Sequence, residues 1–296
     1  MYIPEDIRQN PTPYALGEYI ISPEHSNNLA LQQWIKNLQF EKHESDANRM
    51  QLHSRKRNHL YSFHLPAVDK DIVLKVSQIS RHYRWYRRLN LMLVSLFKNY
   101  SLNAYYGGIA LNKIDVNSPK VLAHWTCKHS AQTKKSYLLY EKVNASMAVF
   151  DLCKQLCQNN QNAELIIIGI SQSLAKIIRK LHANNIRHGD PHAGNFLLTS
   201  PISNIQKITL DSVREMNFTL IDLDKVQFAH NENRWKKKLL NIRCIRRFSV
   251  PNIDASQCLE LYLGRNASIL EKTILKFWMR GGFNIYKWFK ITKKRH

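Results

Sequence analysis

The first half of the chain alternates short apolar runs with polar turns, and the second half follows a helical period. Runs rich in β-branched and aromatic residues predict strands at Leu52–Pro66, where two strands flank a basic turn, and at Asp71–Ile79. Two further strands are predicted at 120–128 and 134–143. Between these pairs, Arg81–Leu111 is first basic and aromatic and then helical in character. The pattern therefore predicts a strand-rich N-terminal half.

Helical spacing is clearest in Glu164–Ile186, where apolar residues recur every three or four positions. Asn184 and Asn185 predict the end of this helix. Short strands are predicted after it at 195–199, 206–212 and 217–223, followed by mainly helical and basic sequence from 235 to 296. The change of character near Glu141–Ala145 predicts a hinge between two lobes.

Basic residues outnumber acidic ones by a wide margin. The chain has 44 Lys and Arg against 22 Asp and Glu, which gives a net charge of +22. With 296 residues, 44% of them hydrophobic, it can bury a sizeable core and is globular rather than disordered. The charge predicts an anionic partner, and nucleic acid, an acidic membrane surface and a phosphorylated substrate all meet that requirement.

Neither a targeting signal nor a disulfide framework is indicated. The start, MYIPEDIRQNP, has no basic region followed by an apolar one, and the longest apolar runs are far shorter than the ~20 residues of a spanning helix. The five cysteines are scattered and lack partners at metal-binding spacing, which favours reduced, mostly buried thiols. We therefore expect a protein in the cytoplasm, free or attached to a membrane face.

The segment IRHGDPHAGNFLL, at Ile186–Leu198, carries the strongest chemical signal. It places Asp190 and Asn195 in a loop directly after the predicted helix, and LIDLD delivers Asp222 after a later strand. Phosphoryl transfer from ATP needs a carboxylate that orients the attacking hydroxyl and accepts its proton. It also needs an amide and a second carboxylate that hold Mg²⁺, and a lysine that binds the phosphates. Lys75 in IVLKV has the sequence context of that strand lysine.

Residues about 60–225 resemble the protein-kinase-like superfamily. Three segments are most similar in sequence to the bacterial lipopolysaccharide core kinases: KSYLLYEKV, LHANNIRHGDPHAGNFLL and FTLIDLDKV. These kinases phosphorylate heptose or Kdo sugars of the inner core. The resemblance implies a two-lobed α+β protein-kinase-like fold with a strand-rich N-lobe and a mainly helical C-lobe. It also implies that ATP and Mg²⁺ are the cofactors.

The resemblance assigns a role to each candidate site residue. Asp190 becomes the catalytic base, and His188 occupies the place of the kinase-loop histidine beside it, where hydrogen bonding suits it better than acid–base work. The Mg²⁺ ligands become Asn195 and Asp222. The ATP-binding residues, with the last two at the hinge, become Lys75, Glu141 and Val143.

Three departures from the kinase pattern leave alternatives open. The turn at His53–Asn58 is basic rather than glycine-rich, and it either holds phosphates by charge or is a solvated turn. No glutamate occurs in 80–110 to pair with Lys75, so Asn103 or a residue from elsewhere takes that place. Asp224 either assists the metal or caps the next turn. The alternative functions are another small-molecule or lipid-linked kinase of the ABC1/UbiB type, and a pseudokinase-like membrane or nucleic-acid binding protein.

Basic and aromatic residues interleave in Arg81–Lys98 and Ile269–His296. Such segments suit an anionic membrane interface, where cations meet headgroups and rings lie at the acyl boundary. The alternative is a helix that packs its aromatic residues on the core; both readings stay open for the C-terminal segment, whereas packing is favoured for the second half of 81–98. No nucleic-acid-binding module is recognisable, so nucleic acid ranks below the membrane as a partner.

The sequence thus predicts an ATP-dependent phosphotransferase with an alcohol group as acceptor. Its expected substrate is an anionic glycolipid, the lipopolysaccharide core, and its expected place is the cytoplasmic face of the bacterial inner membrane, in peripheral contact with it. The expected organisation is an N-terminal extension at 1–45, an N-lobe at 46–143, and a C-lobe at 144–296 that ends in a basic-aromatic helix.

Overall fold

The structure is a computed structural model of the chain. It describes residues 3–14, 17–37, 50–54, 58–78, 100–130, 133–202, 204–229 and 232–280. The chain forms two compact units: Met1–Ala145 together with Phe218–Phe228, and Ser146–Asn217 together with Ala229–His296. The first unit therefore contains a short segment that the sequence order places in the second half of the chain.

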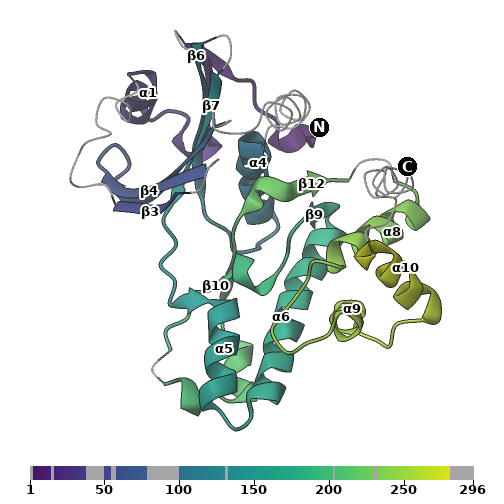
Figure 1. Cartoon of the computed structure of the whole chain (residues 1–296). Helices are drawn as coiled ribbons and strands as arrows, with labels where there is room; N and C mark the ends of the chain where they lie inside the picture. The colour runs from purple at the N-terminus through teal and green to yellow at the C-terminus, as the bar shows by residue number, and fades with distance from the viewer. Residues whose placement is uncertain are drawn as a thin grey trace, which may run out of the picture. The chain divides into compact units, whose positions relative to one another are not determined.

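Within the described residues, the first unit contains a seven-stranded antiparallel sheet with the order β1-β2-β6-β7-β5-β4-β3. Strands β3, β4, β6 and β7 of this sheet are labelled in Figure 1. The strands are β1 (Thr12–Tyr14), β2 (Gly17–Ile21), β3 (Met50–Ser54), β4 (Asn58–Leu65), β5 (Lys70–Gln78), β6 (Val121–Ser130) and β7 (Thr133–Glu141). The strands predicted at 71–79, 120–128 and 134–143 are thereby confirmed, as are the two strands around the basic turn. The tip of that turn, residues 55–57, lies outside the described residues.

Successive side chains of β5 point to opposite faces of the sheet. One set packs in the core with Trp34 of α1 (Leu29–Lys36): Ile72, Leu74 and Val76. Lys75 points to the other face, where α4 (Tyr100–Lys113) contacts β6 and β7. Gly108 allows this close approach, since a Cβ atom there would lie 2.6 Å from Cγ1 of Val121.

Strands β1 and β2 belong to the sheet although residues 1–45 were expected to form an extension. Tyr19 on β2 pairs with Trp125 on β6, and both side chains are buried in the core that also contains Ile21. Alternate apolar positions in β2 thus face the core, which is why these residues join the sheet. The lobe boundaries at 45 and 143 remain predictions.

The second unit is mainly helical. Its helices are α5 (Val149–Asn159), α6 (Ala163–Ala183), α7 (Leu210–Glu215), α8 (Arg234–Ile245), α9 (Ala255–Leu263) and α10 (Ile269–Met279). Helix α6 confirms the helix predicted at 164–186. The apolar side chains on its inner face are buried, including Ile170, Leu174 and Ile178. Its end at Asn184 is followed by Asn185 with φ 59°, a left-handed conformation that asparagine tolerates.

The strand predicted at 206–212 is wrong. The structure has a 3₁₀ turn at Ile205–Lys207 and helix α7 from Leu210, which begins with a capping box between Thr209 and Ser212. The hydroxyl groups there satisfy the first helical N–H groups, and this local hydrogen bonding favours a helix start over a strand. The two short strands β8 (Met147–Ala148) and β10 (Phe196–Leu198) pair antiparallel in the same unit. None of the helices in the described residues has the length and apolarity needed to cross a bilayer.

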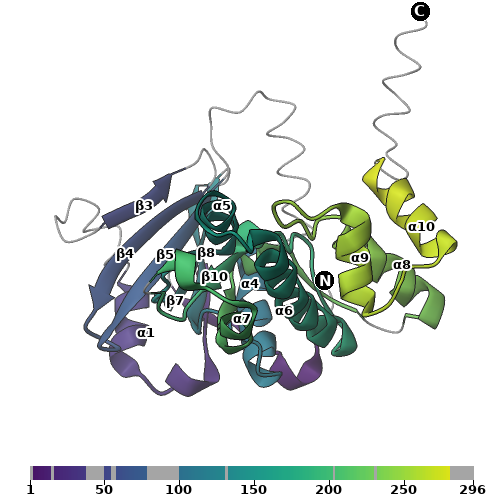
Figure 2. The ribbon, with the colours of Figure 1, turned by 90° about the horizontal axis from the view of Figure 1, so that it is seen from below.

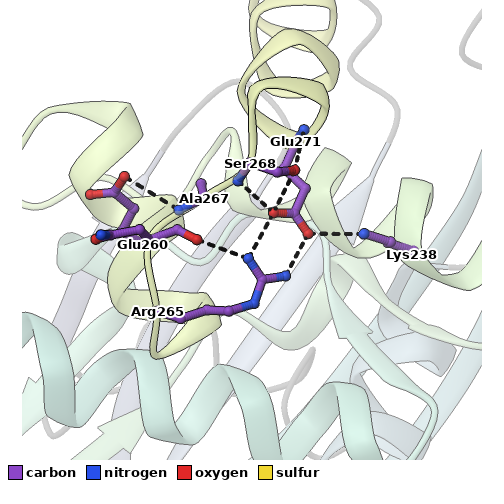
Figure 3. A network of polar contacts seen from close by, with 7 residues as sticks. Lys238, Glu260, Arg265, Ala267, Ser268 and Glu271 are labelled. Atoms are coloured by element: carbon purple, nitrogen blue, oxygen red, sulfur yellow. Dashed lines mark hydrogen bonds and ion pairs between the residues drawn. The ribbon is translucent and has the colours of Figure 1, made fainter.

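Helices α8, α9 and α10 lie beside one another (Figures 1 and 2), and a buried carboxylate connects α10 with α8 and with the segment after α9 (Figure 3). Glu271 on α10 is 1% exposed, and it accepts hydrogen bonds from Arg265 at 2.8 and 3.0 Å and from the N–H of Ser268 at 2.9 Å. Lys238 of α8 lies 2.9 Å from the same carboxylate. The hydrogen bonds from Arg265, helped by Lys238 and Ser268, hold the pKa of Glu271 well below its ordinary value despite burial, which opposes the shift. The carboxylate is therefore ionised and fully satisfied.

We predict that Glu271→Gln destabilises the protein by about 1.5–3 kcal/mol, because the buried side chain loses its charge-assisted hydrogen bonds, while Arg265 and Lys238 are partly exposed and regain water. Since the pKa of Glu271 is lowered by folding, its stabilisation is present above about pH 4.5 and is lost as the pH falls below that value. Urea unfolding at pH 7 and at pH 4 measures both effects.

Asp211→Asn is the matched control, because Asp211 and Arg214 form an ion pair whose side chains are 86% and 76% exposed. It should lower the unfolding free energy by no more than about 1 kcal/mol. Equal losses for the two variants would contradict the importance assigned to Glu271.

Candidate active site

In the first unit, Lys75 lies in the middle of β5, between Leu60 of β4 and Leu138 of β7. Lys75 is buried, with 8% of its surface exposed to solvent. Its Nζ donates hydrogen bonds to Oδ2 of Asp224 at 2.6 Å and to Oδ1 of Asp222 at 3.2 Å. The lysine predicted to bind phosphate is therefore held between two carboxylates.

Burial and charge act on the pKa of Lys75 in opposite directions. Burial lowers the pKa, but the negative charges of Asp224 and Asp222 raise it by more, so that the net pKa lies above the ordinary value. The hydroxyl of Tyr140, on the same face of the sheet, has its pKa raised to about 12 by burial even though Lys75 opposes the shift. Lys75 is thus a permanent cation beside a neutral phenol. Tyr140 was not predicted as a site residue.

The two aspartates reach Lys75 because of the local backbone after β11 (Phe218–Leu220). The N–H of Leu220 donates to the carbonyl of Asn117 at 2.9 Å and anchors the strand. Asp222 then adopts φ 56° and ψ 54°, a left-handed conformation at the start of the 3₁₀ turn Leu223–Lys225. Helix α4 packs against this turn. The Asp222 side chain is 39% exposed and can offer oxygen to a cation, whereas that of Asp224 is 15% exposed and is directed at Lys75.

Asp224 is an acidic partner of Lys75, for which the sequence offers no glutamate in 80–110. The sequence left open whether Asn103 or a residue from elsewhere pairs with Lys75, and the structure shows Asp224 and Asp222 as its partners. Asn103 lies on α4, 8% exposed, and among the described residues its Oδ1 has no hydrogen-bond partner. The second aspartate of LIDLD was the available signal, but its distance from Lys75 could not be read from the chain.

The predicted hinge residues differ in what they can offer a nucleotide. The N–H of Glu141 donates to the carbonyl of Lys120 at 2.9 Å, and its carboxylate forms an ion pair with Lys70. Val143 lies in the irregular segment after β7. Since the amide and side chain of Glu141 already have partners within the unit, Val143 is the better candidate for a contact with adenine.

In the second unit, three contacts organise the loop around Asp190. The side-chain amide of Asn195 donates to the carbonyl of Asp190 at 2.7 Å. Nδ1 of the buried His188 accepts the N–H of Asp190 at 3.3 Å, so His188 supports the backbone of the loop. Arg247 donates to Oδ1 of Asp190 at 3.1 Å. The predicted base, amide and histidine are therefore neighbours, and Arg247 is a contact that the sequence did not reveal.

Asn195 and Asp222 have the donor types that Mg²⁺ prefers. The amide nitrogen of Asn195 is used by Asp190, which leaves its oxygen for a cation. Asp222 provides a carboxylate that is partly exposed. His192, by contrast, caps the 3₁₀ turn Ala193–Asn195 by accepting the N–H of Gly194 at 3.1 Å, a structural role.

The first unit has a buried strand lysine held by the aspartates of LIDLD, and the second unit has an Asp–Asn loop; phosphoryl transfer in protein-kinase-like enzymes uses groups of these kinds. The strand-rich sheet unit and the mainly helical unit make up an α+β chain, as expected. Residues 109–263, more than half of the chain, match the lipopolysaccharide kinase (Kdo/WaaP) family, and the chain belongs to that family.

Similar solved structures include WaaP in complex with acyl carrier protein. Its TM-score is 0.49 at 12% identity, and the match covers 94% of this chain and 98% of that one. The BubR1 kinase domain has a TM-score of 0.38 at 14% identity, with 90% of this chain and 61% of that chain covered. No curated protein sequence matches the chain significantly.

We predict that Asp224→Asn increases the rate at which an amine-reactive reagent modifies Lys75. Without this carboxylate, burial lowers the pKa of Lys75 against less opposition, and each unit of pKa gives about tenfold more of the reactive neutral amine. Labelling with trinitrobenzenesulfonate at pH 9, followed by peptide mass mapping, should show an increase of about tenfold or more.

Asp6→Asn serves as the control, because Asp6 pairs with Lys113 in an ion pair whose two side chains are 66% and 48% exposed. Labelling of Lys113 should change by less than about threefold, since exposed pairs interact weakly. Unchanged labelling of Lys75 in Asp224→Asn would show that Asp224 does not hold its proton.

Proposed function

We propose that this lipopolysaccharide kinase transfers the γ-phosphoryl group of ATP to a hydroxyl of a heptose or Kdo sugar in the inner core. The observation that carries the proposal is the organised loop, in which Asn195 and His188 fix the backbone of an aspartate. Family membership supplies the substrate class. The experiment described below distinguishes heptose from Kdo as the phosphorylated sugar.

In the proposed reaction, Asp190 orients the sugar hydroxyl and accepts its proton. The hydroxyl oxygen forms a bond to the γ-phosphorus while the bond from that phosphorus to the β–γ bridging oxygen breaks, so ADP leaves with the electron pair. Lys75 binds phosphate oxygens as a cation, and Val143 contacts the adenine. Asn195 and Asp222 would hold Mg²⁺, which would neutralise phosphate charge when bound.

The partners of Lys75 also bear on the alternative functions. The pseudokinase-like alternative was supported by the missing glutamate partner of Lys75 and by the missing glycine-rich loop, and Asp224 and Asp222 remove the first of these two grounds. A charged, oriented lysine supports nucleotide binding. The ABC1/UbiB-type alternative predicts transfer to a small acceptor that is not a core sugar, so it is tested by the choice of acceptor.

We predict that Asp190→Ala abolishes most phosphoryl transfer, with a loss of about 10²- to 10⁴-fold in kcat, because the hydroxyl loses the group that orients and deprotonates it. Purified protein, labelled ATP, Mg²⁺ and core oligosaccharide from a strain lacking this gene provide the assay. Mass spectrometry of the product identifies the sugar that gains one phosphate.

Asp222→Asn is the matched variant, and its defect should depend on metal. It loses a charged oxygen ligand, so raising the Mg²⁺ concentration should restore part of its activity, whereas Asp190→Ala should not respond. An unaltered Mg²⁺ titration for Asp222→Asn contradicts its assignment as a ligand. Wild-type turnover by Asp190→Ala contradicts its assignment as the base.

We also propose peripheral contact with the anionic cytoplasmic face of the inner membrane. Segment 81–98, and residues 281–296 of the predicted segment 269–296, lie outside the described residues. Among the described residues, α8 exposes Trp235 and Leu239 beside Arg234 and Lys236, a combination that suits anionic headgroups. The exposed fraction of Trp235 is 64%, although a tryptophan is usually buried in a monomer.

We predict that the double variant Trp235→Ser, Lys236→Glu binds anionic vesicles about tenfold or more weakly than wild type, because ring burial and about 1 kcal/mol per basic residue are lost. Co-sedimentation with phosphatidylglycerol vesicles measures this, and zwitterionic vesicles serve as the reference. Leu165→Ser on α6 is the control, since Leu165 is 60% exposed without belonging to α8. Equal binding by all three proteins would exclude α8 as the contact.

A further inference from the structure

Arg247 lies two residues after the end of α8 and contacts the proposed catalytic base. Its Nη1 donates to Oδ1 of Asp190 at 3.1 Å. The Asp190 side chain is 17% exposed and that of Arg247 is 45% exposed, so the pair lies at the surface of the second unit. A ligand in solution can therefore reach the guanidinium without displacing the core.

The position of Arg247 is set by its neighbours in the chain. Phe248 is 2% exposed and Val250 is 4% exposed, and both anchor the segment in the core. The carbonyl of Ser249 accepts the N–H of Ala193, a residue of the loop that carries Asp190, at 2.9 Å. The segment and the loop are thus hydrogen-bonded to each other. This hydrogen bond and the two buried side chains position Arg247 next to Asp190.

Two neighbouring arginines have different partners. Arg243 stacks over the ring of Trp278 at 5.1 Å, and Arg246 donates to the carbonyl of Trp278 at 2.9 Å. Burial, and then the charges of Arg247 and Arg243, lower the pKa of Arg246, which shows that three cationic groups lie close together. Arg243 and Arg246 are thus engaged with Trp278, whereas Arg247 is directed at Asp190.

A structural role alone accounts for part of this arrangement. Basic side chains at the end of a helix interact favourably with its dipole, and this suits Arg243 and Arg246 on or next to the last turn of α8. It does not explain why Arg247 reaches the carboxylate of the proposed base. Nor does it use the rest of the guanidinium, which has five N–H donors; within the described residues, its contact with Asp190 occupies Nη1.

We propose that Arg247 forms an anion-binding site for the acceptor, and that it binds a phosphate or carboxylate group carried near the reactive hydroxyl. The inference rests on the proposed function and deepens it by naming an acidic acceptor. One edge of the guanidinium contacts Asp190, and the other receives two oxygens of the anion in a bidentate pair. The anion thereby brings the neighbouring hydroxyl to the base, and neutral sugars are bound less well.

The test compares three acceptors and four proteins. The acceptors are deacylated core oligosaccharide, the same material with its phosphates removed by hydrofluoric acid, and the same material with its carboxylates reduced to alcohols. The proteins are wild type, Arg247→Ala, Arg247→Lys and the matched control Arg243→Gln, which removes a neighbouring charge that stacks on Trp278. The values of kcat and KM are measured for each combination.

Removing the acidic group that Arg247 binds should lower kcat/KM of wild type by about tenfold or more, mainly through KM. In Arg247→Ala, the same chemical change should have little further effect, because the interaction is already absent. Arg247→Lys should recover part of the preference, and Arg243→Gln should keep all of it. The acceptor that loses activity, dephosphorylated or carboxyl-reduced, identifies the source of the anion.

A preference for acidic acceptors that is equal in wild type and Arg247→Ala overturns the inference. A wild-type protein that discriminates against neither altered acceptor overturns it as well. Binding without ATP, measured by saturation-transfer NMR with the three oligosaccharides, separates this result from a failure of the proposed function. Arg247-dependent binding of the acidic material in a protein that transfers no phosphate would contradict the kinase reaction and retain the anion site.

Discussion

The first unit depends on one buried charge. Lys75 lies in a strand whose neighbouring positions are apolar, and an unpaired ammonium in such a place is strongly unfavourable. Asp224 and Asp222 compensate it, and to do so the segment Phe218–Phe228 packs with a unit formed mainly by the first 145 residues. The same ion pairs that stabilise this segment present a cation and a partly exposed carboxylate, the two groups that a bound nucleotide and its metal require.

In the second unit, side chains orient Asp190, the proposed base, within an irregular loop. A loop lacks the repeating backbone hydrogen bonds of a strand or helix, so side chains replace them. Asn195 and His188 bind the backbone on either side of the Asp190 carboxylate, while Arg247 binds the carboxylate itself. Orientation before the substrate arrives is what makes a general base effective. Positive charge thus has distinct uses in this chain, in a sheet interior, beside a base and on exposed helices.

Several elements could be predicted because their signals are local. The apolar period of α6 and the β-branched run of β5 depend only on neighbouring residues, and both are present. The family resemblance, carried by the motifs around Asp190 and Asp222, is confirmed by the match over residues 109–263. The prediction of a strand at 206–212 was wrong. The apolar and polar residues there alternate as in a strand, but hydroxyl capping by Thr209 and Ser212 favours the start of a helix.

The sequence by itself determined which chemical groups this protein has: a strand lysine, an Asp–Asn loop and the two aspartates of LIDLD, in motifs that resemble those of a kinase family. Only the tertiary structure decided how they pair, because contacts between Lys75 and Asp224, or between Arg247 and Asp190, join residues that are 149 and 57 positions apart. No local pattern encodes such distances. They follow from which apolar faces are buried together, and that is why Asp224 and Arg247 acquire their roles only in the folded chain.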